Sequence, residues 1–194
     1  MRLYSHFSFD TLSNSYLIGP RGGGAAALFD PVSFDVELLD LIESQGYYIR
    51  SVLLTHCDEE HVGGLRTLRR VYDCTVYAAH PTVMGMSAVT LSHGQVLDVL
   101  PEPVRVIALP GHGSDSLAYA AGGFLFCGSA MSAGECGPAA NPYAKALLLA
   151  NIQNELLSLP DETVVLPFIG PPSTIGLEKR TFPMTDPTRI AEQF

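Results

Sequence analysis

Short runs of hydrophobic residues divide the N-terminal part of the chain into strands. Three such runs are residues 2–7, 14–19 and 25–29 (RLYSHF, NSYLIG and AAALF), and Asp, Asn, Ser and Gly residues separate them. Apolar runs of this length between turn-forming residues are typical of β-strands. The sequence therefore predicts three consecutive strands, the last of which ends at Asp30-Pro31.

The spacing of apolar residues then becomes helical. In residues 34–45 (FDVELLDLIESQ), hydrophobic side chains recur every three or four positions, Ser33 can cap the first turn, and Gly46 suits the exit. A strand over 48–54 (YIRSVLL) follows, and a second amphipathic helix is predicted from Gly64. The first half of the chain is thus expected to form strands and then helices.

The second half of the chain repeats this order. The first predicted elements are a strand over 75–79, a short helix over 81–87 and a strand over 96–100. A strand VRVIAL follows, and then a hairpin LAYAAGGFLFCGS that turns at Gly122-Gly123. The last elements are a helix AKALLLANIQNELLSL capped by Asn141-Pro142 and a strand over 164–168 before a polar tail. Two batches of strands, each followed by helices, indicate two sheets packed face to face with helices outside. We interpret residues 1–194 as a single domain of the α/β class.

Composition narrows the choice of partners and compartment. The formal net charge of −9 opposes binding to nucleic acid and to anionic membranes, because their phosphates would be repelled. The four cysteines lack CxxC spacing and are expected to be free thiols in a reducing compartment. No apolar run reaches the roughly 18 residues of a membrane span, so we expect a cytoplasmic protein that binds a small molecule.

Candidate chemistry is concentrated between Ser51 and Leu65 (SVLLTHCDEEHVGGL). This segment holds six consecutive residues that can bind a metal or move a proton: His56, Cys57, Asp58, Glu59, Glu60 and His61. Charged groups so close together repel one another unless a cation lies among them. A divalent cation is one explanation, and a solvated acidic turn with two incidental histidines is the other.

A second candidate ligand, His112, lies in the segment PGHGSDS. A histidine between glycines is often an ordinary turn residue, but its position directly after a predicted strand favours a ligand presented from a tight loop. Cys57 is interpreted as a packing residue, and Asp115 and Glu135 are interpreted as loop residues.

Five segments, in order, resemble the metallo-β-lactamase superfamily, most closely its hydroxyacylglutathione hydrolase (glyoxalase II)-like branch. They are NSYLI…ALFDP, THCDEEHVGGL (family pattern THxHxDHxGG), LPGHGSDS (TPGHTxGS), FLFCGSAM (LFxGDxLF) and PFIGPPSTIGLEKRTFP (PGHGPxTTIGxEKxxNP). The resemblance covers nearly the whole chain. It implies an αββα sandwich with a metal site at the sheet edge.

The chain departs from the family's ligand set at four positions. His56, His61 and His112 retain the family's histidines, whereas Asp58 replaces a histidine and Glu60 replaces an aspartate. The bridging aspartate of the family is replaced by Ser129, and its final histidine by Ile169. Because a serine hydroxyl is a weak ligand and isoleucine is none, the resemblance implies an incomplete, degenerate two-metal centre.

What the resemblance leaves is a site for at most one divalent ion. Its ligands are predicted to be His56, Asp58 and His112, with Glu60 and His61 as proton acceptor and donor beside it. Two histidines and a carboxylate suit Zn²⁺, Fe²⁺ or Mn²⁺. Whether any metal is bound is left open by the sequence.

Three functions follow from this site. The first is a metal-dependent hydrolase of a thioester or another activated acyl substrate. The second is a pseudoenzyme that retains the fold to bind a ligand or partner. The third is an Fe(II) sulfur dioxygenase-like enzyme, although that branch has a carboxylate where this chain has Ser129. Neither the substrate nor the oligomeric state follows from the sequence.

Overall fold

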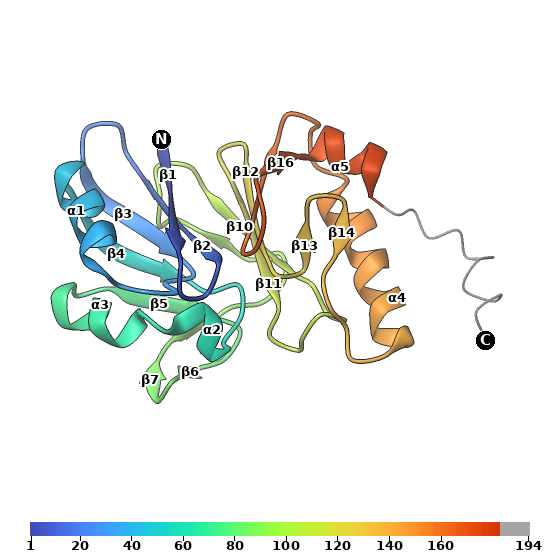
Figure 1. The fold of residues 1–194 in the computed structure, drawn as a ribbon, viewed down its shortest axis with the longest axis horizontal. Helices are drawn as coiled ribbons and strands as arrows, with labels where there is room; N and C mark the ends of the chain where they lie inside the picture. Colours follow the sequence, from blue (N-terminus) through green and yellow to red (C-terminus); the bar gives the residue numbers. More distant parts are fainter. Residues whose placement is uncertain (183–194) are drawn as a thin grey trace.

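Two six-stranded sheets pack face to face, and helices cover the outer side of each, in the computed structural model of the protein (Figure 1). The structure describes residues 1–182. The polar tail expected at the C-terminus and the last residue of the closing motif lie outside the described residues. The αββα architecture and the α/β class predicted from the sequence are confirmed.

The first sheet contains, in spatial order, β1 (Arg2–Ser8), β2 (Ser13–Gly19), β3 (Gly24–Phe29), β4 (Tyr47–Leu53), β5 (Thr75–Ala78) and β8 (Val89–Thr90). The strands β1 to β3 are antiparallel, whereas β3, β4, β5 and β8 run parallel. Parallel neighbours need crossover connections, and the first two are made by α1 (Val36–Ser44) and by α2 (Glu59–Val62) with α3 (Leu65–Val71). These crossovers place α1 and α3 against the outer face of the sheet (Figure 1).

The second sheet contains β16 (Ser173–Thr174), β15 (Val164–Pro167), β12 (Phe124–Gly128), β11 (Leu117–Ala121), β10 (Val104–Ala108) and β9 (Val96–Leu97). Its outer face is covered by α4 (Pro142–Asn151), by the π-helical turn η1 (Ile152–Leu156) that continues α4, and by α5 (Ile175–Thr181). Two small hairpins complete the fold: β6 (Thr82–Val83) with β7 (Met86–Ser87), and β13 (Met131–Ser132) with β14 (Glu135–Cys136). The predicted turn at Gly122-Gly123 and the Asn141 cap are both present.

An aromatic cluster fills the space between the two sheets. Phe29 from β3 stacks on Phe126 from β12, with ring centroids 3.7 Å apart and an interplanar angle of 5°. Tyr119 packs edge-on against Phe29, and all three side chains are almost completely buried. This buried cluster is therefore a main contact between the two sheets.

One predicted helix is wrong: residues 81–87 form the β6–β7 hairpin. Val83 and Met86 pair across it, and the two residues between them, Met84 and Gly85, both have positive φ angles of 49° and 77°. Two consecutive left-handed residues match the twist of a tight hairpin and cannot continue a right-handed helix. The strand predicted over 96–100 is also shorter, because β9 ends at Leu97.

The cap of the first helix is Asp35 and not Ser33, which corrects a second prediction. Asp35 Oδ1 accepts the Leu38 N–H at 2.9 Å, while the Ser33 hydroxyl donates to Asp35 Oδ2 at 3.0 Å. His6 Nε2 lies 3.0 Å from the same carboxylate. Burial opposes ionisation of Asp35, but the hydrogen bonds from Leu38 and Ser33 and the nearby imidazole outweigh it, so the pKa of Asp35 is lowered.

We expect Asp35→Ala to lower the free energy of unfolding by about 1 kcal/mol at pH 7, the usual cost of losing an N-cap. The folded-state pKa of Asp35 is lowered, so its ionic contribution is present above the unfolded pKa of about 3.9. That contribution is lost as the pH falls through the folded-state pKa. Urea denaturation of both proteins from pH 7 to pH 3 checks this. Asp40→Ala, at an exposed position of the same helix, is the control, and an equal loss there would contradict the cap.

Candidate metal centre

The candidate site lies where the ends of the two sheets meet. The chain leaves β4 at Leu53 and reaches His56 through Thr55, whose carbonyl accepts the Leu117 N–H at 2.8 Å. This bond joins the end of β4 in the first sheet to the start of β11 in the second. The loop between β10 and β11 carries His112 and Asp115, and it is therefore brought directly against His56.

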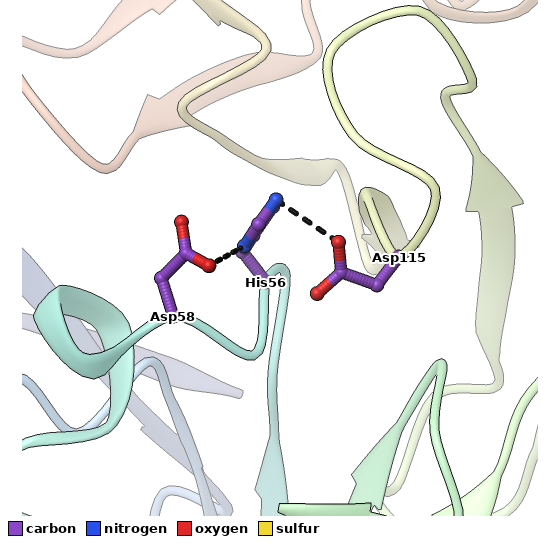
Figure 2. A group of neighbouring side chains, drawn as sticks. All are labelled: His56, Asp58 and Asp115. Carbon is purple, nitrogen blue, oxygen red and sulfur yellow. Dashed lines mark ion pairs between the residues drawn. The ribbon is translucent and has the colours of Figure 1, made fainter.

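His56 lies between two carboxylates, as Figure 2 shows. Its Nδ1 is 3.0 Å from Asp58 Oδ1, and its Nε2 is 3.0 Å from Asp115 Oδ1. Asp58 lies close to Nδ1 but is not aligned for a hydrogen bond with it. Nδ1 is therefore a buried ring nitrogen without a hydrogen-bond partner. The three residues offer donor atoms within 4.8 Å of one another, a spacing that could hold a metal ion.

Asp115, which the sequence suggests is an ordinary loop residue, lies in the loop between β10 and β11 but belongs to the candidate site. Its carboxylate is buried and also accepts the Cys57 N–H at 2.9 Å, 58 positions away in sequence. Although burial favours the neutral acid, this hydrogen bond and the His56 ring hold the pKa of Asp115 below its ordinary value. Asp115 is therefore a carboxylate at neutral pH, and it fixes the orientation of His56.

His112 is arranged as a neutral histidine with one ring nitrogen available. Its Nδ1 is 2.8 Å from the Pro138 carbonyl oxygen, which can only accept, so Nδ1 carries the proton and Nε2 does not. Burial lowers the pKa of His112, which favours the same neutral form. Its ring centroid lies 5.5 Å from that of His56. Sequence and structure agree that His112 comes from a separate loop, but Asp115, not His112, completes the compact donor group around His56.

His61 and Glu60 have different surroundings. His61 is buried, stacks on Phe168 with centroids 3.6 Å apart, and places Nε2 3.0 Å from the Ser129 hydroxyl. Glu60 is exposed at the mouth of the site. Of the two predicted proton carriers on α2, His61 therefore points into the protein and Glu60 points towards solvent.

A cavity of about 330 Å³ opens beside these side chains. Its lining residues include Asp58, Glu60, His61, His112, Ser129, Glu135, Cys136 and Ile169. Three of these are carboxylates and two are histidines, which gives the cavity a set of donors suited to a cation. Ser129 and Ile169, the two departures expected to remove a second metal, both line this cavity.

The cysteines do not contribute donors to the His56 group. Cys57 packs against the core between the first sheet and its helices, and burial together with Asp115 raises the pKa of its thiol to about 11. This agrees with its interpretation as a packing residue. All four cysteines are free thiols, as expected.

The donor set fits a divalent ion. His56 Nδ1 is buried without a hydrogen-bond partner, and the exposed Asp58 carboxylate lies beside it. Asp115 on the opposite ring nitrogen is the type of partner that orients a ligating histidine, and the Pro138 carbonyl has the same relation to His112.

The fold and this site can be compared with those of known protein families and solved structures. The model of the metallo-beta-lactamase superfamily matches residues 9–95. The structure of TTHA1623 in a di-iron-bound form is 30% identical with a TM-score of 0.77, over 93% of this chain and 98% of that one. ETHE1 from Myxococcus xanthus is 28% identical with a TM-score of 0.84, over 94% and 84%. The chain belongs to the metallo-beta-lactamase superfamily.

Within the superfamily, the chain is similar to hydroxyacylglutathione hydrolases. The protein of that name from Yersinia enterocolitica is 36% identical over 124 residues, which are 63% of this chain and 49% of that protein. The chain therefore spans about half the length of the curated relatives it matches. None of the helices in the described part of the chain has both the length and the hydropathy needed to cross a membrane.

Proposed function

We propose that this protein is a hydrolase of a thioester or another activated acyl compound, with a site for at most one divalent ion. The proposed ligands are His56, Asp58 and His112, and Asp115 orients His56. One observation carries this proposal: a buried ring nitrogen of His56 has no hydrogen-bond partner and lies 3.0 Å from an exposed carboxylate. The similarity to hydroxyacylglutathione hydrolases supports the acyl substrate.

A bound Zn²⁺, Fe²⁺ or Mn²⁺ would supply Lewis-acid polarisation of the substrate carbonyl. The side chains around the cavity have separate tasks. Glu60 can accept protons from solvent-side groups, and His61 can exchange a proton with a group at Ser129. The negative net charge and the free cysteines support a small-molecule substrate, no nucleic-acid or membrane partner, and a cytoplasmic location.

Metal analysis tests the proposed stoichiometry. We expect protein purified without chelator to contain at most one tightly bound transition metal per chain, because Ser129 and Ile169 replace two ligands of a two-metal centre. Thioester hydrolysis should fall when this metal is removed and return when one equivalent is restored. Two stoichiometric metals would contradict the proposal, and iron as the single metal would favour the Fe(II) dioxygenase-like alternative.

A restored variant provides the matched comparison. Asp58→His, Glu60→Asp, Ser129→Asp and Ile169→His together should raise the metal content to two per chain if the surrounding backbone still holds these positions. Elemental analysis of the variant beside the wild type measures the difference. An unchanged metal content would show that the loops, and not the four side chains alone, limit the site.

A second candidate function is ligand binding without turnover. The observation that favours it is that each ring nitrogen of His56 lies 3.0 Å from a carboxylate oxygen, an arrangement that a protonated imidazole could hold without a metal. Absence of both metal binding and thioester hydrolysis would support this alternative.

A further inference from the structure

A second set of polar side chains lines the cavity close to His56, whose ring centroid lies 5.6 Å from that of His61. The hydroxyl of Ser129 is 3.0 Å from His61 Nε2, and both residues line the cavity. The other ring nitrogen of His61 faces the buried carboxylate of Asp30, with Nδ1 3.5 Å from Oδ1. This order of serine, histidine and aspartate is the arrangement that activates a serine hydroxyl.

The hydrogen bonds of Thr55 determine which nitrogen of His61 carries the proton. The Thr55 hydroxyl donates to Asp30 Oδ2 at 2.7 Å, and the Thr55 N–H donates to Oδ1 at 2.8 Å. Because its proton is committed to Asp30, Thr55 Oγ1 acts as an acceptor towards His61 Nδ1, 3.2 Å away. Nδ1 is therefore protonated, and the lone pair of Nε2 faces Ser129.

Tight packing holds this geometry. His61 is 3% exposed and its ring lies parallel to that of Phe168, at an interplanar angle of 11°. Gly128 has a φ of 57°, and a Cβ at this position would clash with the Thr55 side chain. Glycine thus allows the end of β12 to approach Thr55, and the next residue, Ser129, is presented at the cavity wall.

We propose that Ser129 is a nucleophile that accepts the acyl group of an ester or thioester, with His61 as its general base. Asp30 and Thr55 are positioning residues. A bond forms between Ser129 Oγ and the acyl carbon, while the hydroxyl proton moves to His61 Nε2. The bond from that carbon to the leaving oxygen or sulfur breaks, and His61 returns the proton to the leaving group. Water then releases the acid from Ser129 by the same sequence of proton transfers.

This inference rests on the proposed hydrolase function for its substrate class, but the nucleophile itself needs no metal. The test therefore uses chelator-treated full-length protein and a fluorophosphonate probe, which phosphonylates activated serines with loss of fluoride. We expect one probe per chain, and peptide mapping of the wild-type protein should place it on Ser129. Ser129→Ala should abolish the adduct, and His61→Asn should slow labelling by about 10²–10⁴-fold.

Matched variants separate activation from folding. Ser132→Ala removes another cavity-lining hydroxyl and should label at the wild-type rate. Thr55→Val should slow labelling, and Thr55→Ser should restore it, because serine supplies the same hydroxyl. No adduct on wild-type protein, an adduct at another residue, or equal labelling of Ser129→Ala would overturn the inference. If the protein binds metal but is not labelled, the proposed metal-dependent function is retained and the serine nucleophile is rejected. If the protein is labelled but binds no metal, the serine nucleophile is retained and the metal site is rejected.

Discussion

Replacing Phe126 with alanine is expected to lower the free energy of unfolding by about 3–5 kcal/mol. Phe126 is 1% exposed and stacks on Phe29 between the two sheets, so its loss leaves a cavity that rigid sheets cannot close. For a chain of this size the corresponding fall in Tm is roughly 6–20 °C. Urea denaturation and calorimetry measure the two quantities.

Phe9→Ala is the matched control, because the same atoms are removed from a side chain that is 84% exposed. Its unfolding free energy should change by less than about 0.5 kcal/mol. Similar losses in the two variants would show that the aromatic cluster does not hold the sheets together.

Adding Zn²⁺, Mn²⁺ or Fe²⁺ to chelator-treated protein is expected to raise its Tm by about 5–10 °C. Binding to the folded state alone stabilises it by about 2.7 kcal/mol at a hundredfold excess of metal over Kd, and each kcal/mol moves Tm by roughly 2–4 °C at this size. His112→Ala should lose the shift, because it removes the ligand contributed by a separate loop. Differential scanning fluorimetry gives the comparison directly.

Two controls make the thermal shift specific to the site. His80→Ala makes the same chemical change at an exposed position and should keep the full shift. Ca²⁺ should stabilise less than the transition metals, because imidazoles suit softer ions. If none of the metals changes the Tm of the wild-type protein, His56, Asp58 and His112 do not bind metal. That result would support the alternative of a ligand-binding pseudoenzyme.

Local patterns in the sequence were sufficient for most of the fold. The strands before Asp30, the helix over 34–45 and the turn at Gly122-Gly123 follow from apolar spacing and from residues that favour turns. The hairpin over 82–87 does not follow from these patterns, because it depends on the backbone conformation of Met84 and Gly85 and not on a hydrophobic period. Serine and aspartate are both good N-caps, so the sequence does not distinguish Ser33 from Asp35, and the folded geometry shows that Asp35 faces the free N–H groups.

The candidate site also has some features that follow from the sequence and others that only the folded structure shows. The superfamily and the donor-rich segment from His56 to His61 follow from residue type and order alone, and so does the prediction that Ser129 and Ile169 stand at two ligand positions of the family. By contrast, the position of Asp115 against His56, and of Asp30 and Thr55 against His61, is visible only in the folded protein. The difference arises because periodicity specifies which face of an element is buried. The partner that a buried polar group finds depends on how distant loops are brought together when the two sheets pack.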